Sequence, residues 1–239
     1  MIKKQINQND RLKLELLNSI EFNYVFANKP INRLKNITKK PEGKSENKSQ
    51  QLDNLKKKIN SIEDCKLKKN SRRIVFGDGN IDSPLMIIGG APGEKEDISG
   101  TTYSGDDGSL LEKMLIAINI KKKNIYTTYA VNYRTPLDRK PNTDEIKRYS
   151  SFLQNHISII NPKLIILMGS TAMETLTGIN GKISLERGKW KEVIVKNISY
   201  NIIITFDPSY LLRAPENKKY SWEDLKKIKE KIKYLNLSI

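Results

Sequence analysis

The sequence predicts an α/β fold, a three-layer α/β/α sandwich around a central, mostly parallel four-stranded sheet. Apolar runs such as 164–168 and 202–206, the second of which contains one threonine, are typical of parallel strands that are covered on both faces. These runs alternate with segments in which apolar residues recur at helical spacing. The first run, 85–89, ends in a glycine-rich loop, as expected where a buried strand delivers a ligand-binding loop to the carboxyl edge of a sheet.

Three regions follow from composition along the chain. Apolar residues at helical spacing predict an N-terminal helix within residues 1–27. Residues 28–50 are rich in Asn, Lys, Pro, Glu and Ser, cannot bury a core, and predict a flexible basic linker. Residues 51–239 form the predicted domain. It opens with a helix that places four aliphatic residues on one face, namely Leu52, Leu55, Ile59 and Ile62.

Within the domain, strands and helices alternate in chain order. The predicted strands are 85–89, 124–132, 164–169 and 201–206, and the predicted helices are 109–118, 143–160, 170–176 and 221–234. Residues 183–187 and 193–195 are expected to pair as a hairpin. Asn142 or Thr143 begins the long third helix, where acidic residues favour the amino end. The last helix is basic and amphipathic, with four residues expected to face inwards, namely Trp222, Leu225, Ile228 and Ile232.

Charge and cysteine content limit the classes of function. The formal net charge is +16, which points to a polyanionic partner, most simply DNA. Residues 1–73 hold 19 Lys and Arg against 8 Asp and Glu, which leaves 24 against 19 for the rest, so part of this charge belongs to the N-terminal extension. Because Cys65 is the only cysteine, the chain cannot form a disulfide within itself. We expect a cytoplasmic monomer with no signal peptide and no membrane span.

The loop after the first predicted strand reads Gly89-Gly90-Ala91-Pro92-Gly93. Its glycines permit positive φ angles and close approach of a ligand to the backbone, while the proline stiffens the turn. This loop suits a flat or anionic ligand, although a tight strand-to-helix turn would need the same residues. It lacks the Gly-Lys-Ser/Thr of a phosphate-binding loop and the glycine spacing of a dinucleotide fingerprint.

Two further segments are expected at the same edge of the sheet. Asn132 closes the second predicted strand, and its amide offers the donor and acceptor that match the edge of a pyrimidine such as uracil. The fourth strand runs into Phe206-Asp207-Pro208-Ser209-Tyr210-Leu211-Leu212-Arg213. A hydroxyl, an apolar wedge and an arginine within five residues can grip a phosphate and hold open a distorted duplex.

Taken in order, these motifs resemble the uracil-DNA glycosylase superfamily, and they look most like its family 4 type. The resemblance rests on the GxxPGxxED loop, the Gly-x-x-Tyr-x-Gly segment that contains Tyr103, the Asn-x-x-x-Pro segment from Asn132, and the Asp-Pro-Ser-Tyr-Leu-Leu-Arg loop. It extends from about Cys65 to Ile232 and leaves out the N-terminal extension.

The resemblance implies an enzyme that flips uracil out of DNA, stacks it on an aromatic ring and hydrolyses the N-glycosidic bond with water. Tyr103 would be the stacking platform, Asn132 the reader of the uracil edge, and the Gly90, Ala91, Pro92 and Gly93 loop the pocket wall. The residues implied to engage DNA are Ser209, Leu211, Arg213 and, in the hairpin, Arg187.

Two positions depart from the family pattern. Gly90 stands where the family usually has a water-orienting glutamate, and Asp207 stands where it usually has a histidine that donates to uracil O2. Losing one such group commonly costs two to three orders of magnitude in rate. The carboxylates that could take over catalysis are Asp207, Glu94, Glu96 and Asp97. His156 lies mid-helix and is expected to be a helix-face residue.

Typical family 4 members also hold a [4Fe–4S] cluster with four cysteines. Only Cys65 is present here, Ile62 occupies the likely first position, and 133–135 offer no thiol, so no cofactor or metal is expected.

Three hypotheses therefore remain from the sequence. The first is a DNA repair hydrolase that excises uracil with altered catalytic groups, and the second is a catalytically inactive DNA-binding or uracil-binding module on the same fold. The third is an unrelated α/β nucleotide-binding enzyme, against which the absence of phosphate-loop signatures and the basic charge both count.

Overall fold

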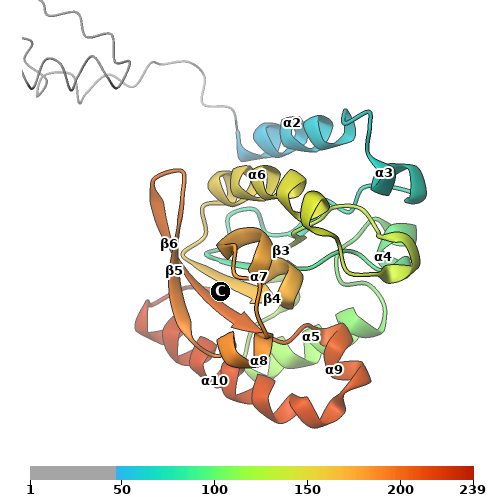
Figure 1. The fold of residues 1–239 in the computed structure, drawn as a ribbon. Helices are drawn as coiled ribbons and strands as arrows, with labels where there is room; N and C mark the ends of the chain where they lie inside the picture. Colours follow the sequence, from blue (N-terminus) through green and yellow to red (C-terminus); the bar gives the residue numbers. More distant parts are fainter. Residues whose placement is uncertain (1–46) are drawn as a thin grey trace, which may run out of the picture. The chain divides into compact units, whose positions relative to one another are not determined.

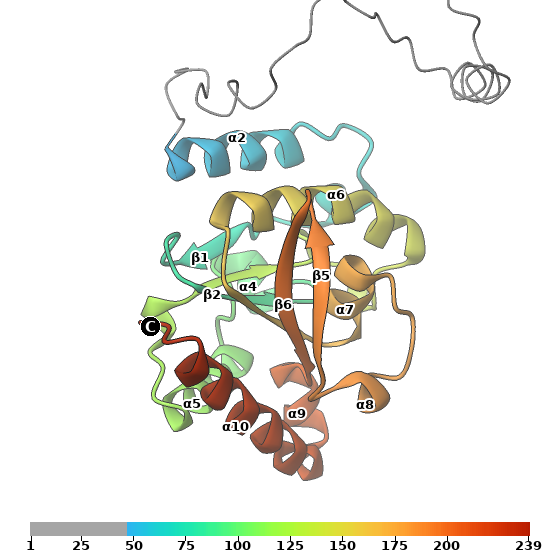
Figure 2. The same ribbon diagram turned by 90° about the vertical axis from the view of Figure 1, so that its left-hand side faces the viewer.

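The computed structural model describes residues 47–239. The predicted N-terminal helix and nearly all of the predicted linker lie outside the described residues. Within 47–239, a single six-stranded sheet has the strand order β1-β3-β2-β4-β6-β5. Helices cover both of its faces, as Figures 1 and 2 show, so the predicted three-layer α/β/α sandwich is confirmed.

The four inner strands are parallel and correspond to the four predicted strands. Their bounds are Leu85–Gly89 for β2, Tyr126–Tyr129 for β3, Leu164–Met168 for β4 and Ile198–Thr205 for β6. The sheet is wider than predicted because two antiparallel strands close its edges: β1 (Gly77–Gly79) against β3 and β5 (Trp190–Val195) against β6. Every residue of β2 and β4 is buried, in keeping with their continuous apolar sequences.

Alternate side chains of the inner strands point to opposite faces and build two separate cores. Met86 and Ile88 of β2 belong to the core beneath α2 (Lys48–Asn60), α6 (Thr143–Ile160) and α7 (Ser170–Thr177). The intervening residues Leu85 and Ile87 belong to the opposite core, beneath α5 (Asp106–Ala117) and α10 (Lys218–Tyr234). Figure 2 shows α2 and α6 on one side of the sheet and α5 and α10 on the other.

The start of α6 follows the predicted residue. Asn142 precedes the helix, and its side-chain oxygen accepts a hydrogen bond from the backbone N–H of Glu145 at 2.9 Å. The Glu145 carboxylate accepts in return from the Asn142 N–H at 2.8 Å. This reciprocal capping box satisfies two backbone donors that a helix start otherwise leaves without partners.

Two local predictions were wrong. Residues Ile183–Glu186 form a short helix, α8, and the hairpin joins β5 to β6 instead. Lys196 and Asn197 connect these strands with φ angles of 48° and 66°, the two positive angles that a tight right-twisted hairpin needs. Trp222 does not face inwards, because α10 turns its Leu225 and Ile228 to the core and leaves the indole 43 % exposed.

Shorter elements connect this framework. They are the helices α3 (Lys66–Asn70), α4 (Glu94–Ser99) and α9 (Pro208–Arg213), and the 3₁₀ turns Lys122–Asn124, Pro136–Asp138 and Pro215–Asn217. None of the helices within residues 47–239 combines the length and the apolar character needed to cross a membrane.

Candidate active site

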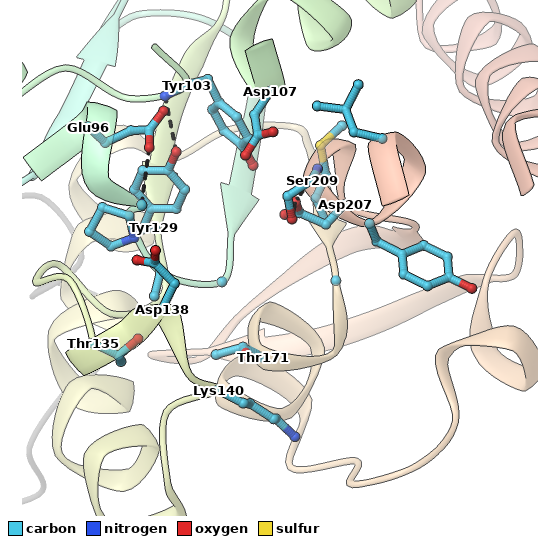
Figure 3. A pocket seen from close by; sticks show the side chains of 18 of the residues that line it. Glu96, Tyr103, Asp107, Tyr129, Thr135, Asp138, Lys140, Thr171, Asp207 and Ser209 are labelled. Carbon is cyan, nitrogen blue, oxygen red and sulfur yellow. Dashed lines mark hydrogen bonds between the residues drawn. The ribbon is translucent and has the colours of Figure 1, made fainter. Parts of the chain in front are cut away.

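A cleft of about 610 Å³ opens at the carboxyl ends of the four parallel strands. The Gly90–Gly93 loop follows β2, Tyr129 ends β3, Gly169 to Thr171 follow β4, and Asp207 follows β6. Parallel strands bring their carboxyl ends to one edge, so segments far apart in the sequence meet there. Figure 3 shows the side chains that project into this cleft.

Two tyrosines form one wall of the cleft. The backbone N–H of Tyr103 donates to the Tyr129 hydroxyl at 3.1 Å, and the two rings are tilted by 37° with centroids 5.1 Å apart. Tyr103 has a φ of 50°, an uncommon conformation for a residue with a side chain. Its hydroxyl is buried and has no hydrogen-bond partner among the described residues. Burial raises the pKa of both phenols well above the ordinary value, so both stay neutral.

The acidic residues on the loop after β2 are engaged elsewhere. Glu96 is 3 % exposed, and its carboxylate accepts from the Gly93 N–H at 3.0 Å and from Ser104 Oγ at 3.3 Å. Asp97 is buried outside the cleft, where it accepts from the backbone N–H groups of Arg72 and Arg73. These bonds make both residues part of the loop framework.

Glu94 borders the cleft at its outer edge. Its carboxylate is largely exposed and lies 3.7 Å from a guanidinium nitrogen of Arg134. An exposed pair at this distance fixes the side chain only weakly. Of the three acidic candidates on this loop, Glu94 and Glu96 line the cleft and Asp97 does not.

Asp207 lines the cleft on the side opposite the tyrosines. It caps α9, and its Oδ1 accepts from the Ser209 N–H at 2.9 Å and from Ser209 Oγ at 2.7 Å. Burial raises the pKa of Asp207, while the hydrogen bonds from Ser209 and the nearby charge of Arg213 oppose that rise. Its second oxygen accepts no hydrogen bond from the described residues and remains open to a ligand or water.

Asp107 is a cleft residue that the sequence analysis missed. It lies in the first turn of α5, half-buried, and its carboxylate has no hydrogen bond or ion pair within residues 47–239. Burial, followed by the charges of Asp207 and Glu96, raises its pKa to about 6, against a lowering by Arg213. Two consecutive acids at a helix start are the available sequence signal, but they do not tell which one faces inwards.

Asn132 does not reach the cleft, so the expectation that it reads a base edge there was wrong. Strand β3 ends three residues earlier than predicted, and Asn132 turns into the protein. Its amide donates to the carbonyls of Val75 and Phe76 at 3.1 and 3.3 Å. Tyr129 occupies the end of β3 at the cleft.

The loop after β6 carries three of the predicted DNA contacts, and one of them is buried in the core. Leu211 is 1 % exposed and belongs to the core beneath α5 and α10, so it cannot act as a wedge. Its neighbour Leu212 is 40 % exposed and lines the cleft, as does the exposed Arg213. Ser209 lines the cleft but holds Asp207 through both of its donors.

Arg187 is an internal anchor and not a free DNA contact. Its Nε and a terminal nitrogen donate to the two oxygens of Asp224 at 3.0 and 2.6 Å. The guanidinium also lies over the rings of Phe206 and Tyr220. This arrangement ties α8 to α10, and it corrects the expectation that Arg187 engages DNA.

The residues around Cys65 do not fit a four-iron cluster. Cys65 is buried, and its Sγ lies 3.4 Å from the hydroxyl of Tyr149. The ring of Tyr133 packs edge-on against Tyr149, and its hydroxyl donates to Asn60 at 2.6 Å. Aromatic side chains therefore occupy the surroundings of the one available thiol. No group of three or more metal-ligating side chains exists in the described part of the chain.

His156 lies on α6 away from the cleft, as expected for a residue of a helix face, and it is buried in the core. It stacks on Phe76 with ring centroids 4.4 Å apart, and its Nε2 shares a 2.8 Å hydrogen bond with the Tyr126 hydroxyl. Burial lowers its pKa to about 3, which keeps the ring neutral.

Comparison with known proteins is consistent with this site. The family model of the "Uracil DNA glycosylase superfamily" matches residues 76–229. The chain is 34 % identical over 172 residues to the type-4 uracil-DNA glycosylase of Thermotoga maritima, covering 71 % of this chain and 88 % of that protein. It is 32 % identical over 191 residues to the type-4 uracil-DNA glycosylase of Sulfurisphaera tokodaii, covering 75 % and 84 %.

A further relative is a DNA polymerase of Bacillus phage SP01. It is 28 % identical over 160 residues, which cover 66 % of this chain but only 17 % of the polymerase. The likeness is therefore limited to one segment of that larger protein.

Proposed function

The chain belongs to the uracil DNA glycosylase superfamily, and we propose that it hydrolyses the N-glycosidic bond of uracil in DNA with a rearranged set of catalytic groups. The observation that carries this proposal is the cleft itself, where the Gly90–Gly93 loop, the Tyr103 ring and the Asp207 carboxylate face one space at the sheet edge. Its volume of about 610 Å³ is ample for one flipped nucleotide.

Each wall of the cleft suits one part of this substrate. The ring of Tyr103 lines the cleft and provides a flat surface for the extruded base. The loop from Gly90 lets the base approach the backbone because position 90 carries no side chain. Arg213 at the rim is placed to meet the phosphate on the flanking strand.

Asp207 supplies the charge that the reaction needs on the sugar side. Cleavage of the N-glycosidic bond leaves positive character on the sugar, which a carboxylate stabilises, and the same carboxylate can take a proton from the attacking water. Burial raises the pKa of Asp207, and the two hydrogen bonds from Ser209 oppose that rise by favouring the ionised form.

A second function, a catalytically inactive module that binds DNA or uracil, is favoured by two observations. Position 90 lacks the usual carboxylate, and the base-side wall holds two neutral phenols, of which Tyr129 is engaged by the backbone N–H of Tyr103. Both proposals predict binding of uracil-containing DNA, and only the first predicts release of uracil.

Single-turnover release of uracil separates the two functions. Labelled single-stranded, U:G and U:A oligonucleotides are incubated with excess protein, and abasic sites are revealed by alkaline cleavage. We expect release well above a preparation of the Asp207→Asn variant, which removes the charge on the sugar side. Binding of uracil-containing DNA without release of uracil from any substrate would support the inactive module. The absence of both binding and release would contradict both functions.

A further inference from the structure

We propose that Asp107 is the catalytic acid of this site, donating a proton to the departing base while Asp207 on the opposite side activates the water. This inference rests on the proposed function and adds a residue that the family motifs do not provide. It gives the cleft two carboxylates with different tasks in place of the missing glutamate and histidine.

Elimination among the cleft carboxylates points to Asp107. Glu96 is held by Gly93 and Ser104, and Glu94 lies exposed beside Arg134. Asp107 alone combines partial burial in the cleft with a carboxylate that has no hydrogen bond or ion pair in the described part of the chain. Figure 3 shows it between Tyr103 and the pair formed by Asp207 and Ser209.

The ring of Tyr103 marks the base side of the cleft. It lines the cleft as the proposed surface for the extruded base, and Figure 3 shows Asp107 beside it. The base side of the cleft is therefore the side on which Asp107 lies.

The two aspartates differ in the hydrogen bonds that they accept. Burial raises the pKa of Asp207, and the two hydrogen bonds from Ser209 oppose that rise by favouring its charged form. Asp107 has no such bonds and is faced by the carboxylates of Glu96 on α4 and Asp207 on α9, by its neighbour Asp106 and by Tyr103, with Arg213 on α9 as the one opposing charge. Its raised pKa, about 6, supports the role of proton donor.

The reaction balances with these two groups and one water. The bond between N1 of uracil and C1′ of the sugar breaks, and its electron pair leaves with the base. Asp107 donates its proton to the base, so that neutral uracil departs and Asp107 becomes a carboxylate. Asp207 takes a proton from water as the water oxygen bonds to C1′, which produces the abasic sugar. Solvent then returns the proton from Asp207 to Asp107.

The decisive experiment is the pH profile of single-turnover uracil release by the full chain and its variants. Because the protonated form of Asp107 is active, release by the wild type should fall as the pH rises through about 6. Asp107→Asn should lower the rate by about 10²–10⁴ and abolish this alkaline decline, since a positioned general acid contributes that much. Asp107→Glu should recover part of the rate together with the decline.

Asp106→Asn is the matched control. It removes the same charge from the same helical turn, but from a side chain that is 81 % exposed and paired with Lys95 at 3.1 Å. Its rate at low pH should equal that of the wild type, and its alkaline decline should persist at a slightly lower pH, because the charge of Asp106 is the smallest of the named causes that raise the pKa of Asp107. Thermal melting of Asp107→Asn should show a Tm at or above that of the wild type, which separates lost chemistry from lost folding.

The outcomes distinguish the two levels of the proposal. A wild type that releases no uracil from any substrate would overturn the proposed function and the role of Asp107 together. A wild type that releases uracil while Asp107→Asn retains its rate would overturn the role of Asp107 alone. A variant that is slowed equally at every pH would also overturn it, because a purely structural residue would behave in that way.

Discussion

The hydroxyl of Tyr129 accepts a hydrogen bond from the backbone N–H of Tyr103 at 3.1 Å. Through this bond the last residue of β3 holds the loop before α5 in a conformation with a φ of 50° at Tyr103. A side-chain hydrogen bond thus stabilises an unusual backbone geometry and sets the position of the aromatic wall. Strained residues of this kind persist where the surrounding structure fixes them.

Tyr129→Phe should destabilise the domain. The substitution leaves the buried N–H of Tyr103 without a partner, which costs about 1–3 kcal/mol in the free energy of unfolding. Urea unfolding followed by circular dichroism measures the change. Tyr234→Phe, at a position 78 % exposed, is the control and should be neutral. Equal stability of Tyr129→Phe and wild type would mean that the hydrogen bond does not hold the loop.

Two substitutions at Tyr103 should separate the contribution of the aromatic ring from that of the hydroxyl group. Tyr103→Phe removes a buried hydroxyl that has no partner in the described residues, so stability should stay level or rise. Tyr103→Leu removes the flat ring and should weaken binding to uracil-containing DNA by about 1–3 kcal/mol, the usual loss for base stacking. Thermal melting measures the stability of Tyr103→Phe. Fluorescence anisotropy with uracil-containing and ordinary oligonucleotides measures the affinity of Tyr103→Leu for DNA. An equal loss on the two DNAs would refute the stacking role.

Replacing Arg187 should lower the stability of the domain, whereas replacing Arg213 should change the salt dependence of DNA binding. Arg187→Ala leaves the Asp224 carboxylate buried with only Thr205 and the nearby Lys227 to offset it, and should cost about 3–5 kcal/mol of stability. Arg213→Ala should leave unfolding nearly unchanged but lower the slope of log K against log salt for DNA binding by about 1. Titrations at several salt concentrations test this, and an unchanged slope would place Arg213 away from phosphate.

The stability of the Asp107→Asn variant should exceed that of the wild type at neutral pH. The folded state holds the protonated form of Asp107, whose pKa rises from 3.8 to about 6. Its contribution to stability is therefore complete below about pH 4 and is lost as the pH rises through about 6. Melting curves at pH 4 and pH 7.5 should show a Tm gap only at the higher pH. A gap of the same size at both values would contradict this titration.

Placing the usual glutamate and histidine of the family at positions 90 and 207 tests whether their absence limits the rate of uracil release. Gly90→Glu with Asp207→His should raise uracil release if these two positions limit the rate. A Cβ at position 90 would lie 3.1 Å from Thr171 Cβ, so α7 must yield by a few tenths of an ångström. Gly90→Ala is the control for this crowding, because it adds the Cβ without the carboxylate. No gain from the double change, with Gly90→Ala still folded, would show that the cleft uses other groups.

Local sequence was enough for the framework of this protein. Runs such as 85–89 and 164–168 are apolar on both faces, and only a parallel strand covered by helices buries them completely. The capping box between Asn142 and Glu145 fixed the start of α6 because both partners lie within one helical turn. The edge strand β1 was missed because Gly-Asp-Gly carries no hydrophobic pattern.

Residue types and their spacing along the chain were enough to predict the α/β sandwich, the glycine-rich loop at its ligand edge and the lack of cysteines for a cluster. Which polar side chains face the cleft depends instead on how distant segments pack together. Asn132 turned inwards and Tyr129 took the strand end, while Asp107 entered the cleft and Arg187 was bound to Asp224. These outcomes depend on partners 37 to 57 residues away or on the helix face that packing turns inwards, and no local pattern encodes either.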